Sequence, residues 1–125
     1  MRLVKYALFL IPIFLVVLAV FAVAAPNQLG VSDSYRVNFS EKVRVADTLL
    51  PQGNYEIRHV MEGSDHIMVF RQLGVRKAIE VRVKCTLVPL TAKAPGDQKI
   101  YELNAANERV LHEMVFKGDL AKHVF

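Results

Sequence analysis

The sequence predicts an all-β protein: a single antiparallel β-sandwich of about seven short strands, preceded by an N-terminal hydrophobic signal or anchor helix. Two observations support this fold class. Apolar and polar residues alternate over short stretches after residue 34, which is the period of a strand with one buried face. Residues that favour turns recur between these stretches at regular spacing, as in sandwiches and small barrels, and helical periodicity is missing there.

The first 24 residues differ in kind from the rest of the chain. Arg2 and Lys5 form a short basic region, and the run from Tyr6 to Ala25 that follows is apolar and uncharged. Near its end, Ala22-Val23-Ala24 matches a small-x-small cleavage site. This layout predicts a secretory signal peptide over 1–24. The run is also long enough to cross a bilayer, so an uncleaved anchor in the inner membrane is the alternative. Both interpretations place the remainder in the periplasm or outside the cell.

The composition of the remainder limits the functions to consider. Without Arg2 and Lys5, fourteen basic residues stand against twelve acidic ones, a net charge of +2, which does not indicate a nucleic-acid partner. Cys85 is the single cysteine, so no internal disulfide forms. The polar stretch 25–34, with Pro and Gly, is expected to be a linker, and 35–125 is expected to be one β domain with a modest core.

Each expected strand presents at least one apolar face. The clearest is 79–87, where Ile79, Val81, Val83, Cys85 and Leu87 alternate with polar residues. The segment 66–72 is apolar on both faces, which predicts a central strand covered on both sides or a strand that crosses the core. In chain order, strands are expected at 35–39, 42–45, 54–60, 66–72, 79–87, 99–104 and 109–116, and 120–125 is expected to be a tail or a short edge strand.

A distinctive turn, Leu50-Pro51-Gln52-Gly53-Asn54-Tyr55, separates the second and third expected strands. Pro51 sets φ for the first central turn position, and Gly53 accepts a positive φ. The segment resembles the Leu-Pro-x-Gly-x-Tyr turn of prealbumin-like, carboxypeptidase-regulatory-like sandwich modules, and the chain looks like small exported bacterial β proteins of unknown function. The resemblance covers this segment only. It implies a sandwich that binds proteins or polysaccharides or acts as a spacer, and it implies no catalytic residue.

The sequence pattern does not indicate an enzyme. No serine after residue 24 lies in a Gly-x-Ser-x-Gly elbow, and no carboxylate pair is apparent. Cys85 lies on the apolar face of 79–87 and is interpreted as a small buried hydrophobe. Five basic residues are interpreted as a solvent-facing strand surface, with a polyanion- or lipid-binding patch as the alternative: Arg71, Arg76, Lys77, Arg82 and Lys84.

The sharpest chemical signal is His-x-Met, which occurs as His59-Val60-Met61, His66-Ile67-Met68 and His112-Glu113-Met114. In a strand, residues i and i+2 share a face, so each pair offers an imidazole and a thioether together. Cu(I) accepts both donors. His66, Met68, His112 and Met114 are therefore candidate copper ligands. The competing interpretation is core packing, because Met68 and Met114 each lie two residues before a phenylalanine.

The expected function is a non-enzymatic interaction or structural module of the cell envelope, with no cofactor. An envelope protein or a polysaccharide is the expected partner, and the membrane is touched only through an uncleaved N-terminal segment. The alternative function is a periplasmic Cu(I)-binding protein that uses the His-x-Met pairs. Convergence of those pairs in space is what separates the two functions.

Overall fold

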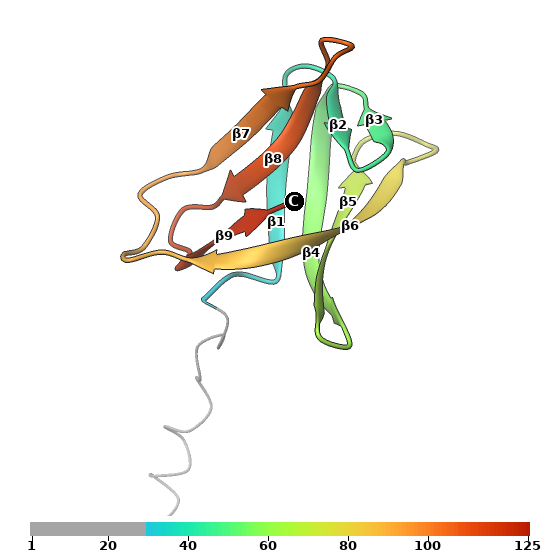
Figure 1. Cartoon of the computed structure of the whole chain (residues 1–125). Coiled ribbons are helices and arrows are strands. Elements are labelled where there is room, and N and C mark those ends of the chain that lie inside the picture. The colour runs from blue at the N-terminus through green and yellow to red at the C-terminus, as the bar shows by residue number, and fades with distance from the viewer. Residues whose placement is uncertain (1–29) are drawn as a thin grey trace, which may run out of the picture.

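The computed structural model describes residues 30–125, and the regular structure in this range consists of β-strands (Figure 1). The expected signal peptide and residues 25–29 of the expected linker lie outside the described residues. No helix with the length and apolar character needed to cross a bilayer is found between residues 30 and 125. The strands are β1 (Ser34–Phe39), β2 (Val43–Val45), β3 (Thr48–Leu50), β4 (Gly53–Glu62), β5 (Asp65–Gln72), β6 (Glu80–Pro89), β7 (Gln98–Leu103), β8 (Arg109–Val115) and β9 (Ala121–Val124).

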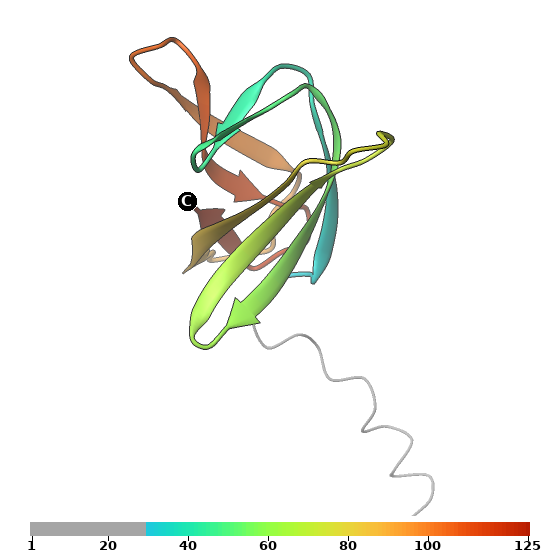
Figure 2. The same cartoon turned by 90° about the vertical axis from the view of Figure 1, so that its right-hand side faces the viewer.

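The all-β class is confirmed, but the number of strands and their pairing differ from the prediction. Nine strands, rather than about seven, form one sheet in the order β1-β4-β5-β6-β9-β8-β2-β3, with β7 paired to β8. The sheet is mixed rather than purely antiparallel, because β2 and β8 run parallel. Strands β1, β4, β5 and β6 lie on one side of the core, and β7, β8 and β9 lie on the other (Figures 1 and 2).

Strand β6 joins the two sides of this folded sheet. Its first part, Glu80 to Cys85, pairs with β5, and its last part, Thr86 to Pro89, pairs with β9. The alternation predicted for this strand is confirmed, since Val81 and Cys85 are buried while Arg82 and Lys84 are exposed. Cys85 therefore lies where the strand passes from one side to the other. Inward-facing side chains of both sides meet there.

The predicted Pro-Gly turn is confirmed and carries an additional contact. Gly53 has φ +146°, a region that residues with a Cβ rarely adopt, and it begins β4. The hydroxyl of Tyr55 donates a 2.6 Å hydrogen bond to the carbonyl oxygen of Pro51. The Tyr55 ring is fully buried in the core. The turn is thus held by its own tyrosine, which also anchors the start of β4.

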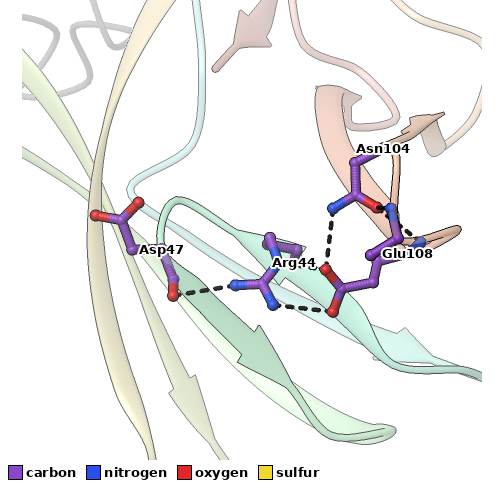
Figure 3. Close-up of polar contacts among 5 residues, drawn as sticks. Arg44, Asp47, Asn104 and Glu108 are labelled. Atoms are coloured by element: carbon purple, nitrogen blue, oxygen red, sulfur yellow. Dashed lines mark hydrogen bonds and ion pairs between the residues drawn. The ribbon is translucent and has the colours of Figure 1, made fainter.

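The alternation did not predict a short hairpin, which lies just before this turn. Strands β2 and β3 pair with each other and reverse at Ala46, which has φ +52°. The first strand agrees with the one expected at 42–45, whereas β3, with three residues, is too short to show a period of its own. The Arg44 guanidinium of β2 donates two 2.9 Å hydrogen bonds to the Glu108 carboxylate and one to the Asp47 carbonyl (Figure 3). This ion pair ties β2 to the start of β8, where the two strands run parallel.

The last strand is internal, although 120–125 was expected to be a tail or an edge strand. Strand β9 lies between β6 and β8, and Ala121 and His123 are buried. Residues from the expected linker also pack on the domain: Val31 is buried, and the carbonyl of Gly30 accepts a hydrogen bond from the Leu120 amide. Both chain segments close the same end of the core.

Candidate metal centre

Three side chains with metal-binding atoms meet in the core. One nitrogen of His59, the sulfur of Cys85 and one nitrogen of His123 all lie within 4.8 Å of one another. The three residues are buried, with exposed fractions of 7%, 8% and 0% respectively. Two imidazoles and a thiol are donors that transition metals share, so this group is the candidate functional site.

The sheet register explains why these residues converge. His59 continues the buried face of β4 that begins with Tyr55 and Ile57. Cys85 lies at the point where β6 changes neighbours, and His123 comes from β9, the strand that β6 joins there. Three different strands therefore supply one ligand each, and each backbone is held by ladder hydrogen bonds. Such a site is rigid because moving a ligand means breaking sheet pairing.

A fourth residue, His66, connects the cluster to the surface. It is the direct cross-strand neighbour of Cys85, and it is half-buried. Its Nδ1 lies 3.1 Å from Nε2 of His59, and the two rings stack with centroids 5.1 Å apart. The buried cluster therefore continues through a hydrogen-bonded pair of imidazoles to solvent.

Burial keeps the three side chains of the cluster, those of His59, Cys85 and His123, uncharged near neutral pH. Burial raises the pKa of the Cys85 thiol to about 11. Burial, followed by the neighbouring His59 and His66, lowers the pKa of His123 to about 4, and burial also lowers the pKa of His59. Neutral imidazoles have a free lone pair, which a metal requires. The thiol must lose its proton when a metal binds, so binding should release one proton.

Hydrogen bonding satisfies only one of the two nitrogens of the His123 imidazole, the Nδ1 that faces the Cys85 sulfur. Its Nδ1 lies 3.7 Å from the Cys85 sulfur, and its Nε2 is the one buried side-chain nitrogen or oxygen between residues 30 and 125 without a hydrogen-bond partner. An unsatisfied buried polar atom costs about 1–3 kcal/mol. With metal–sulfur and metal–nitrogen bonds of about 2.3 and 2.05 Å, two ligands on one ion are separated by about 3.5–3.8 Å. The sulfur–nitrogen spacing already fits a shared ion.

Aromatic rings surround His123 on the side away from Cys85. Tyr35 and Phe116 stack on each other, with ring centroids 3.7 Å apart. Each ring lies edge-to-face with the imidazole, at a centroid separation of 5.8 Å. The Tyr35 hydroxyl donates a 2.5 Å hydrogen bond to the buried Asp119 carboxylate. Burial raises the pKa of Tyr35 and of Asp119. This packing restricts the rotation of the imidazole.

The four side chains expected as copper ligands from the His-x-Met pairs differ in burial and surroundings. Met68 and Met114 are completely buried in the core, whereas His66 is half-buried beside His59. The His112 side chain is 40% exposed and lies 3.8 Å from Glu102. A β-bulge explains this last difference.

At the bulge, Ile100 pairs with Glu113 and Tyr101 with Leu111, which leaves His112 without a partner on β7, although its carbonyl accepts a hydrogen bond from the Phe125 amide. The extra residue disrupts the alternation along the β7 side, and burial differs accordingly, since Met114 is fully buried while the His112 side chain is 40% exposed. The expectation that His112 and Met114 present their imidazole and thioether together therefore does not hold. The first two pairs contribute His59, His66 and Met68 to the region around Cys85, and the third contributes Met114, the cross-strand partner of His123.

Cys85 and His123 were not considered as ligands from the sequence, although a signal for them exists. Cys85 occupies the apolar face of the clearest strand, and His123 lies between Ala121 and Phe125 at a spacing of two. His59 likewise follows Tyr55 and Ile57 on an apolar face. A histidine or cysteine that replaces an aliphatic residue on such a face is the feature to look for. Comparison with protein-family models, curated proteins and solved structures finds no match to this chain.

Proposed function

We propose that this protein is an exported, non-enzymatic module of the cell envelope that binds one Cu(I) ion through His59, Cys85 and His123. The observation that carries the proposal is the buried convergence of two imidazoles and a thiol, with the Cys85 sulfur 3.7 Å from Nδ1 of His123. The site differs from the His-x-Met set expected from the sequence, but the chemistry is the same.

Cu(I) fits these donors better than the other common metals. Soft thiolate and thioether ligands select Cu(I), and imidazole is compatible with it. Met68 and Met114 belong to the same buried cluster as Cys85, so the core around the three residues also contains two thioethers. Structural zinc sites are tetrahedral with four protein ligands, whereas three residues meet here within the described part of the chain. Calcium and magnesium require oxygen ligands, and no carboxylate is part of the group.

The location and the architecture in this proposal rest on the sequence. The apolar segment 1–24 supports export, either by cleavage or as an inner-membrane anchor. The two sides of the sheet, with one core between them, support a β-sandwich of the prealbumin-like kind that the Leu50–Tyr55 turn resembles. An envelope protein or polysaccharide as partner is part of the same proposal.

A Cu(I) titration of the full chain in mild detergent, under reducing conditions and against a competing chelator, tests the proposed function. We expect one Cu(I) per chain, and affinity at least about 100-fold weaker in the Cys85→Ser variant. His112→Ala is the matched control, because this half-buried histidine lies outside the cluster and its replacement should leave the affinity unchanged. A chain that never competes with the chelator would disprove the proposal. Loss of binding in His112→Ala would return the site to the His-x-Met pairs.

A further inference from the structure

The neighbours of the proposed ligands extend the donor set by a thioether. Met68 is the direct cross-strand partner of His59, and its other partner, Val83, lies two residues before Cys85. Directly opposed residues on paired strands share a face, and diagonal neighbours are within reach of long side chains. Met68 is completely buried and belongs to the same cluster as Cys85. The Met68 side chain thus lies opposite His59 and diagonal to Cys85 on the same face.

Two imidazoles, one thiolate and one distant thioether form a donor set that accommodates both oxidation states of copper. Trigonal His₂Cys sites with a weak axial methionine are those of copper proteins that transfer electrons. We propose that the bound copper cycles between Cu(II) and Cu(I), and that the protein carries single electrons, with Met68 as the weak axial ligand. This inference rests on the proposed binding of copper.

The electron balance of this step is simple. Cu(II) accepts one electron from a one-electron donor and becomes Cu(I), and the reverse step passes that electron to a one-electron acceptor. Cys85 remains a thiolate in both states, and no ligand needs to enter or leave. Because Cys85 is the single cysteine and is buried, it has no second thiol in the chain with which to form a disulfide during the cycle.

The fold provides what such a cycle requires. Cu(I) and Cu(II) favour different geometries, so a site that serves both must resist rearrangement. Here the ligands lie on β4, β6 and β9 within one hydrogen-bonded sheet. His66 provides a path to the surface, since its ring is half-buried and lies 3.1 Å from the His59 nitrogen. An electron carrier that docks over His66 would be separated from the copper by two stacked imidazoles.

Loading the full chain in mild detergent with Cu(II), in the absence of oxygen, tests this inference. We expect an intense visible band from thiolate-to-copper charge transfer and a narrow copper hyperfine splitting by electron paramagnetic resonance. Ascorbate should bleach the band and ferricyanide should restore it over repeated cycles. The band should be lost in Cys85→Ser. It should persist in Met68→Leu with a raised midpoint potential, because a thioether stabilises the oxidised ion more than an alkyl group does.

Met114→Leu is the matched control for the axial ligand. Met114 is equally buried and pairs with His123, but its strand β8 is separated from β6 and Cys85 by β9. Met68 lies on β5, which pairs with both β4 and β6, so replacing Met114 should shift the potential less than replacing Met68. An equal shift in both variants would overturn the role of Met68. Tight Cu(I) binding together with no visible band, or with irreversible loss of the thiol on adding Cu(II), would overturn the redox cycle and leave the proposed function intact. Failure to bind Cu(I) would overturn both.

Discussion

Acidification should destabilise the metal-free protein through His123. Burial lowers the pKa of this imidazole from 6.5 to about 4. The unfolded chain takes up a proton below pH 6.5, and the folded protein does so only below about pH 4, so stability is full above pH 6.5 and falls between these values. At about 1.4 kcal/mol per pKa unit, His123 accounts for a loss of about 3 kcal/mol over this range, and about 2 kcal/mol at about pH 5. A domain of this size is stable by about 5–15 kcal/mol.

The groups that face His123 modify this profile in known directions. The pKa of His59 is also lowered by burial, so protonation of His59 adds to the loss on acidification. The pKa of the Asp119 carboxyl is raised by burial, so this group favours the folded state as the pH falls and offsets part of the loss. His123→Leu removes the largest contribution and leaves the other two in place.

Urea denaturation of the full chain, with a chelator present, from about pH 7.5 to about pH 4.5, measures this effect through the free energy of unfolding. The profile of His123→Leu should be flatter than that of the wild type. At neutral pH the variant should be about as stable, because losing the unsatisfied Nε2 offsets losing the weak hydrogen bond between Nδ1 and the Cys85 sulfur. His112→Leu, at a half-buried position outside the cluster, should follow the wild-type profile. Parallel profiles for wild type and His123→Leu would refute the buried, neutral histidine.

Three further predictions concern the frame around the site. Tyr55→Phe loses the hydrogen bond to the turn carbonyl and should lower the free energy of unfolding by about 0.5–1.5 kcal/mol in urea melts. Gly53→Ala, at φ +146°, should cost about 1 kcal/mol or more, whereas Gly96→Ala, in open space without a positive φ, should be nearly neutral in the same melts. Hydrogen bonds from Arg44 lower the pKa of Glu108 to about 2, so its carboxyl should titrate near that value by nuclear magnetic resonance, and a midpoint near 4.5 would show that the pair is not held in solution.

The sequence by itself determined most of the strands and which side chains face inward. Alternation in β6 placed Cys85 on the buried face, and the Pro51–Gly53 turn fixed the start of β4 with its positive φ. The apolar character of both faces of β5 correctly predicted a central strand, which lies between β4 and β6. These features depend on residues close in the chain. Local steric preferences and the period of two are sufficient to predict them.

Only the tertiary structure decided which strands are neighbours, and so which inward-facing residues meet. Cys85 and His123 are 38 positions apart, and they meet because β9 is inserted between β6 and β8 instead of remaining at an edge. The bulge at His112 is equally invisible in the alternation and separates His112 from Met114. Strand order and register result from the sum of many long-range contacts. A pattern within one strand contains no information about that sum, which is why the residues of the cluster could be placed on buried faces but not brought together.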